Sequence, residues 1–521
     1  MSQILDAVDR HARERPDALA AVEIGPDRTR RELTWGELDL AADRAATRLL
    51  ELGVVPGEPV AYQLPNRLEF LTLTLAILRI GAVCEPLMPI FREHELEFML
   101  REAAVRVLIV PERFRGHGYR AMATGLRERL PGLQHVLVLD GPEQPFDVSP
   151  DANALAARRP GAAAVAQLLF TSGSTGEPKG VLQRQDVLSL AAEAHIRHFA
   201  LTPADVIYIP SPLAHQTGFL YGLWIAWLLG ATQVIQTIWD AEVGFEAMRS
   251  TGVSFVQAAT PFLADLVRVA DELDQTLPEL RVFVATGAAI PRELAREARA
   301  KLGAEVGGAF GTTESCLGAA FAPGDPPERA WGSDGRALEG ITLRVVDDAG
   351  NPLPPNAEGN FEIFTPTLFE GYLNRPELTA AALTPDGYYR TGDLARIDEH
   401  GYLRITGRVK DVINRGGEKV PVAEVEQLLY THPAVREIAI VAMPDPRLGE
   451  RACAFVVPEP GATLEFVEMQ RHLDDNRLAK PYWPERLELV ESLPHTPSGK
   501  IQKYLLRARL AGSEERKAVF P

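Results

Sequence analysis

Cysteine, basic charge and long apolar runs are all scarce in this sequence, and each shortage excludes a class of protein. The three cysteines lie far apart, so no pair has the spacing of metal ligands or of a disulfide framework. Lys and Arg total 54 against 71 Asp and Glu, and this formal net charge of -17 argues against a nucleic-acid partner. The longest apolar run, 218–231, is too short for a membrane span and predicts a buried helix.

Length and composition indicate a globular protein of more than one domain. The 521 residues exceed the roughly 250–300 that a single core supports. With 46% hydrophobic and 24% charged residues, the composition is that of ordinary globular proteins. Residues 1–6 lack the basic and apolar regions of a signal peptide, so we expect a cytoplasmic protein, with a homodimer left open.

Short apolar segments alternate with longer helical patterns over the first two thirds of the chain. This alternation predicts an α/β fold of mostly parallel sheets with flanking helices. Thr34 and Glu37 form a capping-box pattern at the start of a helix that ends near Gly53. The expected strands are 60–64, 106–110, 136–139, 165–170, 206–209, 234–238, 253–258 and 282–285.

The pattern changes near residue 340, where half-buried strands are separated by turns. Segments 342–346, 360–364 and 402–405 alternate apolar and polar residues and predict a small β-rich subdomain over about 340–407. A helix at 422–430 and strands at 437–442 and 452–457 then predict a small α+β domain. We therefore expect a large N-terminal domain at 1–407, a hinge at 408–410 and a small mobile C-terminal domain at 411–521.

The segment Thr171-Ser172-Gly173-Ser174-Thr175-Gly176-Glu177-Pro178-Lys179-Gly180 follows the strand at 165–170. Glycines let backbone N–H groups approach an anion, hydroxyls add donors, and Lys179 adds a positive charge. The spacing does not fit the G-x-x-x-x-G-K-[ST] loop. A flexible linker is the alternative, but the preceding strand, Pro178 and Lys179 favour a phosphate-binding loop.

Together with four later segments, this loop resembles the adenylate-forming superfamily of acyl-CoA synthetases, peptide-synthetase adenylation domains and luciferases. The later segments occur in the family's order. They are Phe310-Gly311-Thr312-Thr313-Glu314, Tyr389-Arg390-Thr391-Gly392-Asp393, Gly407-Arg408-Val409-Lys410-Asp411 and Pro497-Ser498-Gly499-Lys500-Ile501.

The resemblance implies roles for individual residues in binding ATP and Mg²⁺. Lys500 would bridge the acid's carboxylate and the α-phosphate, and Glu314 would be the magnesium ligand, since Mg²⁺ prefers oxygen ligands. Asp393 would accept the ribose hydroxyls, with Arg408 supporting the ribose or phosphate. The remaining expected nucleotide contacts are Thr171, Ser172, Gly173, Ser174, Thr175, Gly176 and Lys179 in the loop, Gly287, Ala288 and Phe310 at the adenine, and Gly311, Thr312 and Thr313 near the phosphates.

Several of these assignments have a purely structural alternative. For Lys500 and Glu314 the alternative is an ordinary solvated surface residue, and for Asp393 it is a turn residue. His215 is assigned to the mouth of the acid pocket and not as a general base, against the alternative of a structural histidine. Phe310 stands where the family usually has tyrosine, so ring stacking is retained and the hydroxyl is lost.

The segment after the hinge bears on the acceptor of the acyl group. Gly417 would leave room for a pantetheine arm, although a turn glycine is the alternative. Lys410 is the expected pivot, and Asn414 and Lys419 are expected to contact phosphates after domain rotation. The sequence thus predicts an ATP- and Mg²⁺-dependent ligase that joins a medium-chain, carbocyclic or aryl acid to CoA. A carrier-protein thiol or an amine as acceptor, and a nucleotide-binding protein without turnover, are the alternatives.

Overall fold

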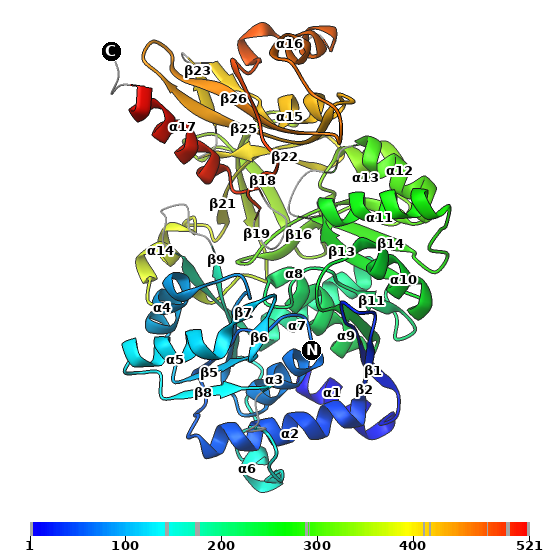
Figure 1. Ribbon diagram of the computed structural model, residues 1–521, viewed down its shortest axis with the longest axis vertical. Helices are drawn as coiled ribbons and strands as arrows, with labels where there is room; N and C mark the ends of the chain where they lie inside the picture. The colour runs from blue at the N-terminus through cyan, green and yellow to red at the C-terminus, as the bar shows by residue number, and fades with distance from the viewer. Residues whose placement is uncertain are drawn as a thin grey trace.

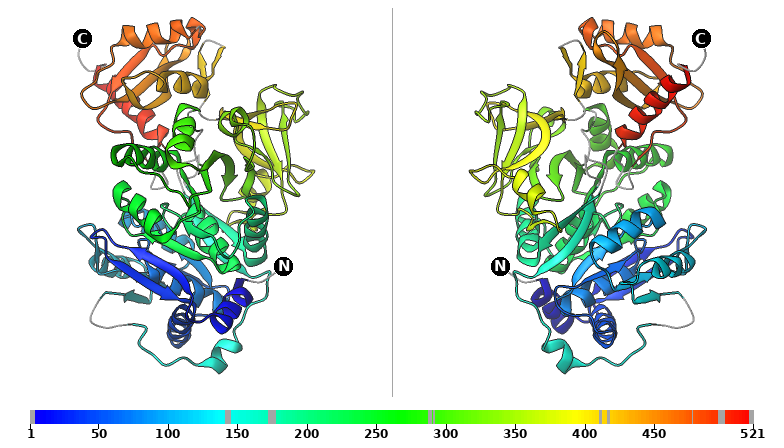
Figure 2. Two further views of the ribbon diagram at one scale, coloured as in Figure 1. Left: turned by 90° about the vertical axis from the view of Figure 1, so that its right-hand side faces the viewer. Right: turned by 90° about the vertical axis from the view of Figure 1, so that its left-hand side faces the viewer.

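The structure is a computed structural model, in which the chain forms four large sheets with flanking helices (Figure 1). Figure 2 shows the orange-to-red C-terminal segments at the opposite end from the blue N-terminal helices, with the yellow-green β-rich sheet to one side. The described residues are 4–140, 145–171, 178–286, 290, 292–409, 412–415, 418–476, 478–495 and 501–517.

The first sheet has nine strands in the order β17-β16-β15-β14-β13-β11-β12-β1-β2. From β15 to β1 neighbouring strands are parallel, and the edges are antiparallel. The strands are β1 (Leu19–Ile24), β2 (Arg30–Thr34), β11 (Val206–Tyr208), β12 (Thr232–Gln236), β13 (Phe255–Ala259), β14 (Val282–Thr286), β15 (Glu305–Thr312), β16 (Cys316–Ala320) and β17 (Arg336–Ala337).

The second sheet has seven strands in the order β20-β10-β9-β4-β3-β5-β8. Its last five strands are parallel, whereas β10 and β20 are antiparallel additions at one edge. Because β20 comes from far along the chain, this edge brings two distant segments together. The strands are β3 (Pro59–Tyr62), β4 (Val83–Pro86), β5 (Val107–Val110), β8 (His135–Val138), β9 (Val165–Thr171), β10 (Lys179–Arg184) and β20 (Gly371–Tyr372).

Helices pack around both sheets, as alternating strand and helix patterns predict. Thr34 and Glu37 form the expected capping box of α2, with the Glu37 amide 3.2 Å from the Thr34 hydroxyl. The helices of this region are α1 (Ile4–Glu14), α2 (Trp35–Glu51), α3 (Leu68–Arg79), α4 (Glu93–Glu102), α5 (Tyr119–Arg129), α6 (Ala152–Ala156), α7 (Gln185–His198), α8 (Gln216–Gly218), α9 (Ile225–Leu229), α10 (Ala241–Thr251), α11 (Thr260–Leu273), α12 (Arg292–Leu302) and α13 (Pro327–Gly332).

The apolar run at 218–231 is helical and buried, as expected, but it is not one regular α-helix. Phe219–Trp224 is a π-helix between α8 and α9. The run ends at Gly230, whose φ of +73° terminates α9 in a left-handed conformation. Among the described residues, no helix is both long enough and apolar enough to cross a membrane.

The β-rich region is an antiparallel sheet in the order β18-β19-β21-β22. It consists of β18 (Thr342–Val346), β19 (Gly359–Phe364), β21 (Tyr389–Ile397) and β22 (Leu403–Arg408), with α14 (Pro376–Ala381) beside it. The C-terminal α+β region follows, with its own apolar core around Val425, Leu429 and Ile440. It contains β23 (Ile413–Arg415), β24 (Glu418–Val420), β25 (Val435–Asp445), β26 (Gly449–Pro458), β27 (Arg486–Leu489), α15 (Val422–Tyr430), α16 (Phe466–Asp475) and α17 (Lys503–Lys517).

A buried carboxyl group lies in the middle of the seven-stranded sheet. Glu85 is on β4 and is fully buried, on the face that carries Val83 in an apolar cluster with Ala61 and Leu168. In the described part of the chain, neither of its carboxylate oxygens has a hydrogen-bond partner. Burial therefore raises the pKa of Glu85 well above its usual value, because the charged form has no compensation.

Replacing Glu85 with glutamine is expected to change how stability depends on pH. The unfolded chain releases this proton near pH 4.3, whereas the folded chain retains it to a higher pH. As pH rises from about 4.3, wild-type stability should fall by up to about 1.4 kcal/mol per pH unit, and Glu85→Gln should lack this slope. Melting temperatures of the two proteins from pH 4.5 to 8 measure this dependence of stability on pH. Parallel curves for the two proteins would contradict the prediction. Glu362→Gln is the control: it removes a buried but ion-paired carboxylate and should keep the slope of the wild type.

Candidate active site

The two ends of the predicted phosphate loop are fixed by an antiparallel strand pair. Thr171 ends β9, Lys179 begins β10, and the two residues are partners in the ladder. The Thr171 hydroxyl lies 3.5 Å from the Lys179 carbonyl oxygen. Residues Ser172, Gly173, Ser174, Thr175 and Gly176 lie outside the described residues, so the expected contacts of this loop stay predictions.

Gly311 and Thr312 end β15 and pair with β16, and residues 313–315 form the turn between these antiparallel strands. The Thr312 hydroxyl accepts a hydrogen bond from the Ser315 amide at 3.0 Å. Cys316, which is fully buried, closes the turn with a φ of +57°, a conformation that few residues with a side chain adopt. A turn tied this tightly holds Thr313 and Glu314 in a defined place.

Backbone carbonyls of this turn are bonded to side chains and amides from two other segments. The Gln183 side-chain amide on β10 donates to the Thr313 carbonyl at 2.8 Å. The Phe369 amide donates to the Glu314 carbonyl at 2.7 Å. The Thr367 hydroxyl donates to the Ser315 carbonyl at 2.9 Å. The turn is thus fastened to β10 of the seven-stranded sheet and to the segment between β19 and β20.

The Glu314 carboxylate and the Lys179 ammonium group both contact the side chain of Tyr372. The Tyr372 hydroxyl donates to Glu314 Oε1 at 2.9 Å, and Lys179 Nζ lies 5.0 Å from the centre of the Tyr372 ring. Burial and the neighbouring Glu314 raise the pKa of Tyr372, so its hydroxyl stays protonated and remains a donor. Lys179, expected to contact phosphates, and Glu314, expected to bind Mg²⁺, thus share a contact with Tyr372 although they are far apart in sequence.

Gln183 and Tyr372 were not anticipated from the sequence. Gln183 is fully buried on β10. Its amide and that of Gln216 both approach the Cys316 sulfur, at 3.9 and 3.8 Å. The sequence signal for both Gln183 and Tyr372 is weak, because their importance depends on long-range pairing between β10, β20 and the β15–β16 turn.

The expected ribose pair is formed by neighbouring antiparallel strands. Asp393 on β21 and Arg408 on β22 are ladder partners, and Arg408 Nε lies 3.0 Å from Asp393 Oδ1. Asp393 is almost fully buried, while Arg408 is about half exposed. Phe310 on β15 packs edge-on against Phe361, with ring centres 5.1 Å apart.

His215 caps the short helix that precedes the π-helix. Its Nδ1 accepts a hydrogen bond from the Thr217 amide at 3.2 Å. The loop before it is held by Asn66, whose side chain accepts from the Leu213 amide at 2.8 Å. Because the next residue, Gln216, reaches Cys316, the His215 segment lies against the turn that carries Glu314.

Several expected site residues lie outside the described part of the chain. These are Gly287, Ala288, Lys410, Gly417 and Lys500. Asn414 and Lys419 are ladder partners in β23 and β24, but nothing is described of their side chains.

The residues that flank Lys500 are anchored to the C-terminal region. His495 and Ile501 form an isolated β-bridge. His495 Nε2 lies 3.1 Å from the Glu437 carboxylate, and this contact raises the pKa of His495. Lys503 Nζ lies 2.7 Å from Glu426. The short segment between His495 and Ile501 thus starts and ends at fixed points of the α+β region.

The chain matches two protein-family models and is similar to several known proteins. A family model described as AMP-binding enzyme matches residues 8–373, and one described as AMP-binding enzyme C-terminal domain matches 424–500. The chain is 37% identical to a medium-chain fatty-acid–CoA ligase of Escherichia coli K12, over 97% of this chain and 90% of that one. It is 36% identical to a salicyl-AMP ligase / salicyl-S-ArCP synthetase of Mycobacterium tuberculosis, over 94% and 88%.

A solved structure is similar over nearly the whole chain. It is the anthranilate CoA ligase AuaEII in complex with anthranoyl-AMP, with a TM-score of 0.88, 26% identity, and coverage of 98% of both chains. Fold and site together define an adenylate-forming ligase. The chain belongs to the AMP-binding enzyme family, and the predicted α/β fold with its β-rich and C-terminal α+β regions is confirmed.

Proposed function

We propose that the protein activates a carboxylic acid with ATP and transfers the acyl group to the thiol of CoA. The observation that carries the proposal is that Glu314 and Lys179 both contact the side chain of Tyr372. It places one carboxylate and one ammonium group where the phosphate-loop strands end. This pair suits a Mg²⁺–triphosphate, because Mg²⁺ commonly takes one or two carboxylates together with phosphate oxygens.

The residues divide between holding the nucleotide and stabilising charge. Asp393 and Arg408 would hold the ribose, Phe310 would face the adenine, and Thr312 and Thr313 would contact phosphates. Glu314 would hold Mg²⁺, which supplies charge neutralisation at the phosphates when bound. Lys500, delivered by the C-terminal domain turning about a hinge at 408–410, would stabilise the charge that gathers at the α-phosphate.

Two group transfers make up the reaction. In the first, a carboxylate oxygen of the acid attacks the α-phosphorus of ATP, a new P–O bond forms, and pyrophosphate leaves. In the second, the thiol loses its proton, its sulfur attacks the acyl carbon, and AMP leaves with the electron pair of the broken C–O bond. Positioning and electrostatic stabilisation are the main contributions that the side chains make to both steps.

CoA is proposed as acceptor on two grounds of different reach. Gly417 lacks a side chain where a pantetheine arm is expected to pass, which favours a pantetheine thiol, free or carrier-borne, over an amine. Similarity to a medium-chain fatty-acid–CoA ligase and an anthranilate CoA ligase favours CoA over a carrier protein. The similar salicyl-AMP ligase / salicyl-S-ArCP synthetase represents the alternative. For the acid, we propose a medium-chain, carbocyclic or aryl carboxylate.

An acid panel tests the proposal in two stages. Pyrophosphate release from ATP and Mg²⁺ is measured with straight-chain, carbocyclic and aryl acids, and thioester formation is then measured with CoA. We expect adenylation of at least one of these acids, followed by its thioester. Adenylation without a thioester on any acid would favour a carrier protein or an amine, whereas no pyrophosphate release would refute activation of these acids.

Replacing Gly417 with leucine is expected to lower the rate of thioester formation by at least 100-fold and leave acyl-AMP synthesis within about threefold of wild type. The reason is steric, because a leucine side chain would fill a passage that the missing Cβ leaves open. Single-turnover measurement of each step, with Gly132→Leu on an exposed turn of the N-terminal region as control, decides it. Equal losses in both steps would contradict the predicted passage.

A further inference from the structure

We propose that Tyr372 is a positioning residue that holds Glu314 and Lys179 apart and aims both at the site of the phosphates. This inference rests on the proposed function, since it assigns the phosphates and Mg²⁺ to these two side chains. It concerns Tyr372 alone, which has no place in the reaction and touches none of the reacting atoms in the proposal. Its two contacts, at 2.9 Å to Glu314 and 5.0 Å to Lys179, come from opposite parts of one side chain.

Tyr372 is itself firmly held. Strand β20 pairs antiparallel with β10, with Tyr372 opposite Val181. The Tyr372 amide donates to the Thr379 hydroxyl at 2.9 Å, and its ring packs edge-on against Phe369 with centres 4.8 Å apart. Only 8% of Tyr372 is exposed. A side chain fixed on its backbone and its ring can hold a second group in a defined orientation.

The hydroxyl of Tyr372 constrains the Glu314 side chain, which the hydrogen bonds to the backbone of the turn do not. The carbonyls of residues 313–315 are bonded to Gln183, Phe369 and Thr367. These bonds fix the path of the chain but not the rotation of the Glu314 side chain. The bond from Tyr372 fixes Oε1 and leaves the second carboxylate oxygen for a cation.

The ring of Tyr372 keeps two opposite charges from neutralising each other. An ammonium and a carboxylate at the same site would pair directly if nothing separated them. In the described part of the chain, neither Lys179 nor Glu314 forms an ion pair. Lys179 lies instead over the ring face, whose negative quadrupole attracts a cation without consuming its charge. Both charges thus remain available to a polyphosphate and its metal ion.

Another tyrosine of the chain offers a matched control. The Tyr402 hydroxyl donates to Asp325 Oδ1 at 2.9 Å, and Arg336 lies 5.0 Å from the centre of the Tyr402 ring. Tyr402 therefore has the same two kinds of contact, a carboxylate at its hydroxyl and a cation at its ring, but none with the β15–β16 turn. It differs in that its two charged partners, Arg336 and Asp325, also pair directly at 3.4 Å. Tyr402→Phe removes the same atom and the same kind of hydrogen bond.

The test is calorimetric titration of each protein with ATP, once in Mg²⁺ and once in EDTA. Tyr372→Phe keeps the ring and loses only the hydroxyl, so we expect about tenfold weaker binding of Mg²⁺–ATP, the loss typical of one hydrogen bond to a charged group. Binding of ATP in EDTA should stay within about twofold of wild type. Tyr402→Phe should match wild type in both titrations, and thermal melting verifies that all variants are folded.

A double variant separates positioning from a general structural effect. If Tyr372 acts through Glu314, Tyr372→Phe should weaken Mg²⁺–ATP binding no further in a Glu314→Gln background. Unchanged binding by Tyr372→Phe, an equal loss in EDTA, an equal loss in Tyr402→Phe, or additive losses in the double variant would each overturn the inference. Wild-type protein whose ATP affinity does not respond to Mg²⁺ would overturn it too, and would remove the proposed metal role of Glu314 with it.

Discussion

Replacing Lys500 with alanine is expected to slow acyl-adenylate formation by about 100- to 1000-fold, the usual loss when one preorganised stabilising group is removed from a charged transition state. Transfer of a supplied acyl-AMP to CoA should stay within about threefold of wild type, because the α-phosphate no longer has to be attacked. Pyrophosphate release measures the first step, and thioester formation from synthetic acyl-AMP measures the second.

Lys503 offers a control for the loss of a nearby positive charge. It lies three positions beyond Lys500, but its ammonium group is already paired with Glu426 at 2.7 Å. Lys503→Ala should therefore leave both steps within a few-fold of wild type. Pyrophosphate release at the wild-type rate in Lys500→Ala would remove this residue from the mechanism.

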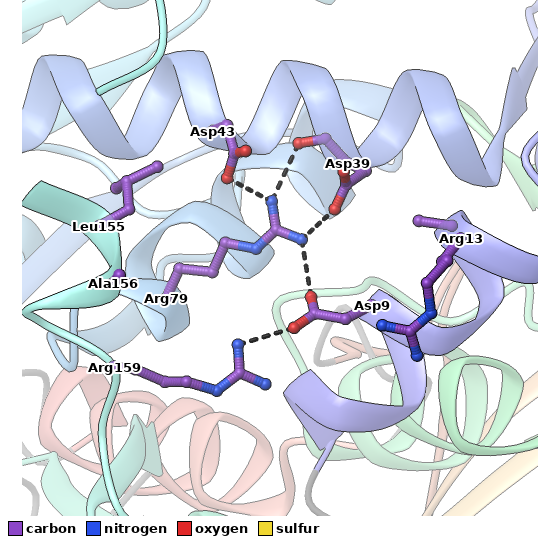
Figure 3. Close-up of a pocket in the computed structure, with 9 residues that line it drawn as sticks. Asp9, Arg13, Asp39, Asp43, Arg79, Leu155, Ala156 and Arg159 are labelled. Carbon is purple, nitrogen blue, oxygen red and sulfur yellow. Dashed lines mark hydrogen bonds and ion pairs between the residues drawn. The ribbon is translucent and has the colours of Figure 1, made fainter. Parts of the chain in front are cut away.

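Replacing Arg79 with methionine is expected to destabilise the N-terminal region by about 1–3 kcal/mol, less than for a fully buried pair, because the three carboxylates it leaves behind are about a third exposed. Arg79 ends α3 and is 8% exposed. Its guanidinium group contacts Asp9 on α1 at 3.1 Å and Asp43 on α2 at 2.6 Å, and it is also bonded to Asp39 (Figure 3). Without it, three carboxylates from two helices would repel one another.

The measurement is the midpoint of thermal or urea unfolding, followed at two pH values. Burial already raises the pKa of Asp43, and losing Arg79 should raise it further. The loss of stability caused by Arg79→Met should therefore become smaller as pH falls, because these carboxylates take up protons and no longer repel one another. Arg13→Met is the control, because Arg13 lines the same hollow but is exposed (Figure 3). A midpoint unchanged by Arg79→Met would show that α1, α2 and α3 are held by apolar packing alone.

Local sequence patterns predicted the secondary structure well because the relevant interactions are local. The capping box of Thr34 and Glu37 and the helix at 422–430 are confirmed. Alternating residues at 342–346 and 360–364 likewise predicted two neighbouring strands correctly. The π-helix at 219–224 was not foreseen, because its apolar residues fit an ordinary buried helix equally well.

The candidate site was predicted in its motifs but not in the contacts that join them. Asp393 and Arg408 were assigned to one ligand, and the structure places them in one ion pair. Tyr372, by contrast, belongs to a two-residue strand that pairs with β10, far away in the sequence. No local pattern reports such a pairing, so its contact with Glu314 could be found only in three dimensions. The roles of all the site residues, Lys500 and Gly417 among them, stay predictions.

The π-helix at 219–224 makes the packing of the helix that follows it sensitive to chain length. A π-turn carries about one residue more than the α-helical turn it replaces. Deleting one residue there would turn every later side chain of the helix by about 100° relative to His215. Trp227, which is fully buried, would then lose its place in the core, so the extra residue can be lost only together with a repacked core.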